Sequence, residues 1–282
     1  METRIRIIGL VIPDLTDTHF AEVARGVSSI MQPKGYSVLV SNSEGDAAAE
    51  RQALNLLCTC PNVEGLIVAS SQPAEESQFF ARMGGYKPYV LIDRKFAGLD
   101  ANYVGTDDEQ LGFTATEHLI SRGCRHIAHI RGPETSSGAG RVHGYRAALA
   151  RHGLKAAPGY TAQGGSDDAA GHEAMRVLLS VNPRLDGVVC YNDAVAVGAI
   201  KAILDAGLEV PYDIDVVGAG NVHYSDILRV PLSTVDLNSP LIGESAARLL
   251  LEVIEAAEPA PAKQVVIPFM LLARESSKAA VA

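Results

Sequence analysis

Tryptophan is absent from this chain, and no apolar run approaches the ~20 residues that a membrane helix needs. Positive charge is also in short supply: 24 Lys and Arg face 33 Asp and Glu, a formal net charge of -9. Affinity for nucleic acid depends on cations that neutralise phosphates. The sequence therefore argues against a membrane-spanning protein, and against a chain that binds DNA by itself.

Cysteine is scarce as well, with four residues in all: Cys58, Cys60, Cys124 and Cys190. Cys58 and Cys60 form a C-x-C pair, but no second pair or histidine cluster completes a metal site. Small buried apolar side chains are the better interpretation of all four. We expect no metal and no cofactor.

The N-terminus, "METRIRIIGLVIPDL", places basic residues before an apolar run. That run is short, and Pro13-Asp14 follows where a signal peptide would have small residues for cleavage. We interpret it as the first strand of the fold. The chain is accordingly expected in the cytoplasm.

Most of the remaining sequence alternates between apolar, β-branched runs and segments with apolar residues at helical spacing. Such alternation predicts an α/β fold with doubly wound parallel sheets. Two successive sets of similar size occur, joined near residues 105–108 by a short acidic segment. The expected strands cover 5–12, 36–42, 64–70, 89–93, 125–132, 185–192, 213–220 and 264–271, and the expected helices 20–31, 46–57, 76–83, 109–121, 141–152, 168–181, 193–206 and 241–257.

Enzyme motifs were sought at the strand ends. Gly218-Ala219-Gly220 follows an apolar run, but His223 stands where a dinucleotide fingerprint needs its third glycine. "GPETSSGAGR" lacks the Gly-Lys-Ser/Thr of a P-loop, and no G-x-S-x-G elbow occurs. No nucleophile–base set is evident, so we expect a protein that is not an enzyme.

In open α/β sheets, ligands bind outside the carboxyl ends of the strands. The polar residues that follow the strands are then the informative ones. Several segments that contain them resemble those of a known family. These are "GLVIPDLTDTHFAEVARGV", "VLIDR", "VGTDDEQLGFTATEHLISRGCRHIAHI", "RVHGYRAAL", "YNDAVAVGAIKAILDAGLEVPYDIDVVG" and "PLSTVDLNSPLIGESAARLLL". On these segments the whole chain resembles the effector-binding core of the LacI/GalR family of bacterial transcription regulators, which is itself similar to periplasmic sugar-binding proteins.

The resemblance implies a periplasmic-binding-protein type I fold of two lobes, with a ligand cleft between them and three chain crossings. The N-terminal lobe would comprise 1–106 plus 237–263, and the C-terminal lobe 107–236 plus 264–275, leaving 276–282 as a frayed tail. Ligand would close the lobes like a hinge. Relatives carry a helix-turn-helix head before this core, so the chain would be an excised domain or a headless relative. A homodimer is also implied, and the 79–83 segment "FFARM" is a candidate surface unless its residues are core.

The resemblance also implies site residues, one set per lobe. In the first, Phe20 would stack on an apolar ligand face, and Asp93 and Arg94 would bond hydroxyls or a carboxylate. In the second, Arg141 would do likewise and Asn192 would suit a polyol. The full set is Asp17, His19, Phe20, Ser70, Asp93, Arg94, Arg141, Ser166, Asn192, Gly220 and Asp236.

Structural alternatives exist for several of these residues. Asp17 would serve as a helix N-cap, and so would Asp193. Asp93 and Arg94 would form a surface pair, which stabilises by only ~0–1 kcal/mol. Ser70 and Ser166 are as well explained by structure as by ligand binding.

The chain departs from the family at Ala219-Gly220, where relatives commonly have Phe-Asp. With no Trp and 5% aromatics, it does not favour an aromatic sandwich around a sugar. His19, Arg94 and Arg141 would supply positive charge, so we hypothesise an effector larger than a pentose, or a sugar derivative with an acidic group. The leading function is an effector-sensing regulator domain, with a transport-type solute-binding protein or an enzyme on the same scaffold as alternatives.

Overall fold

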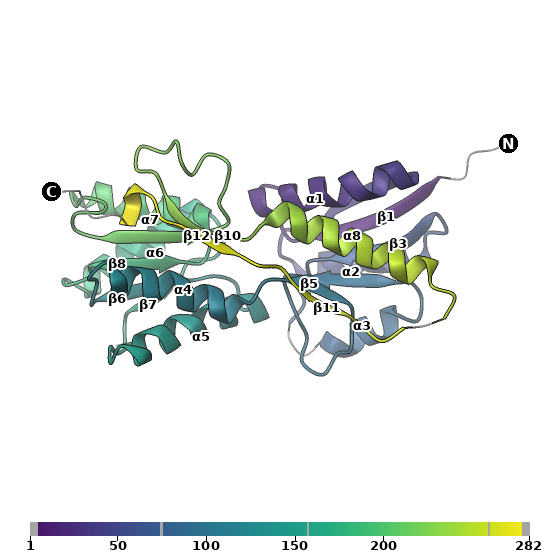
Figure 1. Ribbon diagram of the computed structural model, residues 1–282, viewed down its shortest axis with the longest axis horizontal. Coiled ribbons are helices and arrows are strands. Elements are labelled where there is room, and N and C mark those ends of the chain that lie inside the picture. Colours follow the sequence, from purple (N-terminus) through teal and green to yellow (C-terminus); the bar gives the residue numbers. More distant parts are fainter. Residues whose placement is uncertain (1–4, 74–75, 157, 259, 278–282) are drawn as a thin grey trace. The chain divides into compact units, whose positions relative to one another are not determined.

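The apolar runs and the amphipathic segments build two α/β units, each around its own six-stranded sheet (Figure 1). The computed structural model describes residues 5–73, 76–156, 158–258 and 260–277. Unit 1 comprises Met1–Thr106 and Asn238–Ile267, and unit 2 comprises Asp107–Leu237 and Pro268–Ala282. The predicted α/β fold class is confirmed.

The sheet of unit 1 has the order β11-β5-β4-β3-β1-β2, and every neighbouring pair is parallel. Strands buried on both faces are nearly continuous in apolar residues, as in "RIIGLVI" of β1. The strands are β1 (Arg6–Ile12), β2 (Tyr36–Asn42), β3 (Val63–Val68), β4 (Tyr89–Ile92), β5 (Tyr103–Gly105) and β11 (Gln264–Val266).

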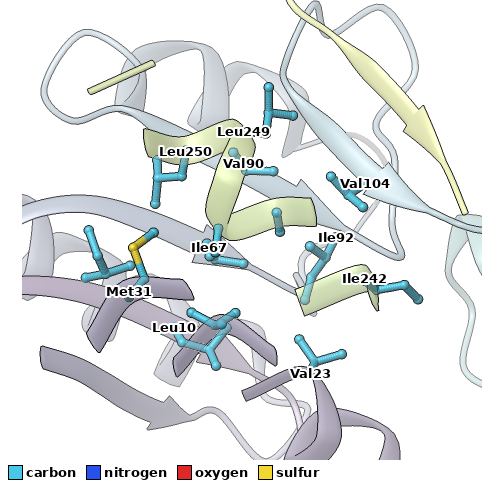
Figure 2. Close-up of a cluster of buried hydrophobic side chains, with 14 of the residues drawn as sticks. Leu10, Val23, Met31, Ile67, Val90, Ile92, Val104, Ile242, Leu249 and Leu250 are labelled. Atoms are coloured by element: carbon cyan, nitrogen blue, oxygen red, sulfur yellow. The ribbon is translucent and has the colours of Figure 1, made fainter. Parts of the chain in front are cut away.

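Helices cover both faces of this sheet. On one face, α1 (Thr18–Met31) and α8 (Ser239–Glu255) bury a cluster that includes Leu10, Ile67 and Leu250 (Figure 2). On the other face lie α2 (Ala47–Thr59) and α3 (Ser77–Met83). Phe80 and Met83 of α3 are buried in that second cluster, whereas Ala81 and Arg82 of the same "FFARM" segment are exposed.

Unit 2 repeats the arrangement with the order β12-β10-β9-β8-β6-β7, in which only the β10–β12 pair is antiparallel. Its strands are β6 (Ile127–Arg131), β7 (Thr161–Gln163), β8 (Gly187–Cys190), β9 (Asp215–Ala219), β10 (Ser233–Asp236) and β12 (Met270–Leu272). One face is covered by α4 (Asp108–Ser121) and α5 (Ser136–Arg151), the other by α6 (Asp168–Val181) and α7 (Asp193–Asp205).

Several boundaries differ from the prediction. Helix α5 begins at Ser136 instead of 141, because the Thr135 hydroxyl caps it by accepting from the Gly138 amide at 3.3 Å. The short strands β5, β7 and β10 were not predicted. Three or four residues give too little periodicity to identify a strand.

The predicted last strand, 264–271, is in fact two strands in different sheets. Gln264–Val266 pairs with β5 in unit 1, whereas Met270–Leu272 pairs with β10 in unit 2. The chain therefore passes from unit 1 to unit 2 after Ile267, and not after residue 263 as expected.

The start of the expected tail is ordered as well. Ser276 and Ser277 form the 3-10 helix Glu275–Ser277 and are fully buried. The Ser276 hydroxyl donates to the Val216 carbonyl at 2.7 Å, and the Ser277 hydroxyl donates to Ser233 Oγ at 2.6 Å. Residues 278–282 lie outside the described part of the chain.

Candidate functional site

The predicted site residues of unit 1 follow β1, β3 and β4, which are neighbours in the sheet. Neighbouring parallel strands end at the same edge, so their following residues gather there. The structure brings these residues together along this edge: Asp17, His19, Ser70, Asp93 and Arg94.

His19 is the central residue of one half of this edge. Its Nε2 lies 2.7 Å from Asp93 Oδ2, and its Nδ1 lies 2.8 Å from the hydroxyl of Ser239 at the start of α8. Asp17 caps α1, because its Oδ1 accepts from the His19 amide at 2.9 Å. The cap and the bridge together fix the imidazole beside the end of β4.

A buried carboxylate, Glu50 of α2, organises the other half. Its Oε1 accepts from the Ser70 hydroxyl at 2.7 Å, and its Oε2 accepts from the Ser71 amide. Arg94 donates to the Ser70 carbonyl, so the expected Asp93–Arg94 surface pair gives way to two separate contacts. Burial raises the pKa of Glu50, which is fully excluded from solvent.

Glu50 is absent from the predicted site, although the sequence holds a signal for it. Glu50 stands four and seven residues before Leu54 and Leu57, which places all three on the same inward face of α2. A lone acid at such spacing indicates a buried carboxylate that needs donors. Here the donors come from the segment after β3.

Phe20, the residue predicted to stack on the ligand, is largely buried within unit 1. Its ring is 7% exposed and packs in the core cluster with Ile8 and Val23, edge-on to the His19 ring. It packs α1 against the sheet, so most of its surface is covered within unit 1. Position 20 faces inward because it starts the apolar stripe of α1.

In unit 2, Arg141 of α5 is buried and already paired. Its Nε lies 2.9 Å from Asp108 Oδ1 at the start of α4, and its Nη1 donates to the Tyr191 carbonyl. Its guanidinium also lies over the Tyr191 ring, 4.6 Å from the centroid. The arginine is therefore held rigidly at the end of β8, with a carboxylate to balance its charge.

Asn192 follows β8 and caps α7. Its Oδ1 accepts from the Val195 amide at 2.9 Å, and its Nδ2 donates to the Ser166 carbonyl at 2.8 Å. The expectation that Asp193 caps this helix is wrong by one residue, since Asn192 has the extended backbone of an N-cap. Asp193 is the first residue of α7, and its side chain turns into the unit.

Asp193 explains the Gly-x-Gly at the end of β9. Its Oδ1 accepts from the Thr234 hydroxyl at 2.6 Å and its Oδ2 from the Val222 amide at 2.9 Å. A Cβ on Gly218 would lie 2.3 Å from Oδ1, and one on Gly220 would lie 3.5 Å from Oδ2. Gly218 thus leaves room for a fully buried carboxylate, whereas a Cβ on Gly220 would make only an ordinary contact with it. Burial raises the pKa of Asp193 to about 6.

Asn221 and Asp236 meet beyond these glycines. The Asn221 Nδ2 donates to Asp236 Oδ2 at 3.0 Å, and Arg274 Nη2 donates to the Asn221 Oδ1 at 2.8 Å. Arg274 also donates to the Ser225 hydroxyl at 3.0 Å. Asn221 has a φ of 52°, a left-handed backbone that asparagine tolerates.

None of the described helices is long and apolar enough to cross a membrane. Within residues 5–73, 76–156, 158–258 and 260–277, no group of three or more His, Cys, Asp or Glu is placed to hold a metal ion.

Comparison with known proteins places this arrangement in a family. Residues 116–277 match the model of a periplasmic binding protein-like domain. The ribose operon repressor of Escherichia coli (strain K12) is 34% identical over 86% of this chain and 74% of its own length. The repressor PurR of Mannheimia succiniciproducens is 30% identical over 87% of this chain and 73% of its own. This chain belongs to the LacI family of transcriptional regulators.

Solved structures of transcriptional regulators agree with this assignment. A LacI family transcriptional regulator from Mycobacterium smegmatis superposes with a TM-score of 0.84 at 30% identity, covering 95% of this chain and 98% of that one. A transcriptional regulator CelR–cellobiose complex gives a TM-score of 0.87 at 26% identity, covering 97% and 86%.

Within this LacI-family chain, the charges at both strand-end edges are largely balanced. Arg141 faces Asp108, and Arg94 acts electrostatically on the buried Glu50. His19 bonds Asp93. The unpaired positive charge that suggested an acidic ligand is therefore not what these residues present in the structure.

Proposed function

We propose that this chain is the effector-sensing domain of a LacI-type DNA-binding regulator, and that its effector is a neutral polyol of the sugar class. The strand-end residues of both units would contribute to recognition: Asp17, His19, Ser70, Asp93 and Arg94 in unit 1, and Arg141, Ser166, Asn192, Gly220 and Asp236 in unit 2. A ligand that favours one domain arrangement would shift the population of arrangements.

The ion pair between Arg141 and Asp108 is the observation that carries the neutral ligand. An arginine that reads a free carboxylate or phosphate on a ligand needs a charge that no neighbour has cancelled. Here Asp108 lies 2.9 Å away, with both side chains mostly buried. A ligand hydroxyl can still accept from such an arginine without adding charge.

The relatives support a sugar. One is named a ribose operon repressor, and one neighbour structure is described as a cellobiose complex. Within our proposal, Gly220 lacks the acidic side chain that relatives commonly carry there, and this leaves one acceptor fewer. Asn221 and Asp236 lie beside it and offer amide and carboxylate groups to hydroxyls.

We further propose that operator DNA is bound through a helix-turn-helix segment outside this chain. The regulator would act as a homodimer in the cytoplasm. The net charge of -9 supports a separate DNA-binding segment. The relatives are named as repressors, which favours a sensor over an enzyme or a transport protein.

Calorimetric titration tests the ligand class. The purified chain is titrated with D-ribose, cellobiose and other neutral sugars, and with the corresponding sugar acids. We expect saturable binding of at least one neutral sugar, with the matched acid weaker by tenfold or more, about 1.4 kcal/mol. Binding of sugar acids in preference to neutral sugars would overturn the proposal of a neutral ligand. Chemical conversion of a bound sugar would overturn the proposal that the chain is a sensor.

A further inference from the structure

Asp193 is the first residue of α7, and its carboxylate lies inside unit 2. It is fully buried, and Gly218 of β9 leaves the room that its Oδ1 occupies. A buried carboxylate is costly unless its acceptors are satisfied. The groups that face it are Arg274, from the segment after β12, and the Cys190 thiol of β8.

The hydrogen bonds of Asp193 converge on one short turn. Thr234 of β10 donates its hydroxyl to Asp193 Oδ1 and accepts from the Asn221 amide at 3.2 Å. The Val222 amide donates directly to Oδ2. Both amides that follow Gly220 are thus held, one directly and one through a hydroxyl, by the same carboxylate.

That turn carries the Asn221 side chain toward Asp236. Gly220 has a φ of 135°, which glycine adopts readily, and Asn221 has a φ of 52°, a left-handed backbone that costs energy unless its surroundings support it. Releasing the two amides would free the turn to relax, and the Asn221–Asp236 contact would loosen with it.

We infer that Asp193 is a positioning residue for effector recognition, which fixes the turn 220–222 so that Asn221 and Asp236 are presented together to the ligand. This inference rests on the proposed function, since it assigns those two residues to the effector. Asp193 itself acts through the turn and need not touch the ligand.

Ionisation of Asp193 then has two opposite consequences. The carboxylate form is the stronger acceptor for the Thr234 hydroxyl and the Val222 amide, so the turn is best held at high pH. Burial raises the pKa of this carboxyl, however, so its protonation at low pH stabilises the folded chain relative to the unfolded chain. As the pH falls, ligand affinity is therefore expected to decrease. Over the same range, the contribution of Asp193 to the stability of the fold is expected to increase.

Asp193→Asn tests the inference, with Asp215→Asn as the matched control. Asp215 is also a buried aspartate with a raised pKa, but it lies at the opposite end of β9 and contacts Cys124. Hydrogen exchange of the free chain should show the Asn221 and Val222 amides losing about tenfold or more of their protection in Asp193→Asn, and keeping it in Asp215→Asn.

Thr234 provides a second route should Asp193→Asn fold poorly. Thr234→Val removes the hydroxyl that links the carboxylate to the Asn221 amide, and Thr234→Ser keeps it. The valine variant should lose protection of the Asn221 amide, and the serine variant should restore it.

The same variants are then titrated with D-ribose from about pH 5 to pH 8. Wild type should bind more weakly as pH falls through the Asp193 pKa, whereas Asp193→Asn should bind weakly at every pH. Unchanged amide protection in Asp193→Asn, or a pH profile identical to that of wild type, would overturn the inference. If wild type does not bind D-ribose, that sugar is excluded as the effector, and amide protection alone decides whether Asp193 holds the turn.

Discussion

A Cβ atom on Gly218 would lie 2.3 Å from Oδ1 of Asp193, closer than any real contact between such atoms. The C-terminal end of β9 is therefore shaped by a carboxylate that packs against it from α7. Gly218→Ala should destabilise the chain by about 1–3 kcal/mol, because the buried carboxylate must shift and lose hydrogen bonds. Chemical denaturation measures this loss.

The control for that substitution is Gly85→Ala, where the nearest atom to the new Cβ is the Arg82 carbonyl at 3.3 Å. Gly85 is exposed and its neighbour needs to move by only a few tenths of an ångström, so alanine should change stability by no more than about 0.5 kcal/mol. Equal losses at the two glycines would contradict the special role of position 218.

Glu50→Ala should destabilise the chain by about 2–4 kcal/mol, because it leaves the Ser70 hydroxyl and the Ser71 amide without their buried acceptor. The matched control is Glu22→Ala, which removes only a surface pair with Arg25 at 3.3 Å and should cost under about 0.5 kcal/mol. Unfolding midpoints of the two variants, measured side by side, give the comparison.

The pH dependence of stability follows from the raised pKa of Asp193. A carboxyl whose folded pKa is above its unfolded value favours folding most when it is protonated, below about pH 4. That contribution is lost as the pH rises to about 6, and the shift from 3.8 to about 6 corresponds to about 3 kcal/mol. Glu50 acts in the same direction.

Urea unfolding at several pH values checks this dependence. Stability should change less between about pH 4 and pH 7 in Asp193→Asn than in wild type, by up to about 3 kcal/mol. Parallel curves for the two proteins would show that Asp193 does not titrate as its burial predicts.

Asp108→Asn should convert Arg141 from a balanced cation into an unbalanced one. Removing the charge of one partner in a buried ion pair costs about 3–5 kcal/mol of stability, so the variant should unfold more easily. It should also gain affinity for sugar acids relative to neutral sugars, since the arginine is then available to a ligand carboxylate. Calorimetry with a matched neutral and acidic pair measures this, and no change in their ratio would count against the role assigned to Asp108.

The sequence was sufficient to predict the layers of the fold and the edges at which site residues lie. Strands such as β1 and β9 are long apolar runs, and their ends are marked by Pro13-Asp14 and by Gly218 and Gly220. What the sequence did not indicate is which side chains bond each other. The pairing of Arg141 with Asp108 joins residues on different helices, and no local pattern encodes it.

The two buried carboxylates illustrate the same limit. Glu50 was overlooked because its donors, Ser70 and Ser71, lie some twenty residues along the chain. Asn192 and Asp193 both suit the N-cap position, so the sequence does not decide between them, and the extended backbone at Asn192 does. Phe20 illustrates the limit as well, because an aromatic after a strand fits stacking on a ligand as well as it fits a core.

Hydrogen exchange of the chain, with and without its tightest-binding neutral sugar, tests the central claim most directly. If the strand-end residues of both units recognise one effector, saturating sugar should increase protection in segments 17–20 and 92–94 of unit 1 and in segments 191–193 and 220–222 of unit 2. Protection confined to one unit, or distributed away from the strand ends, would contradict the account.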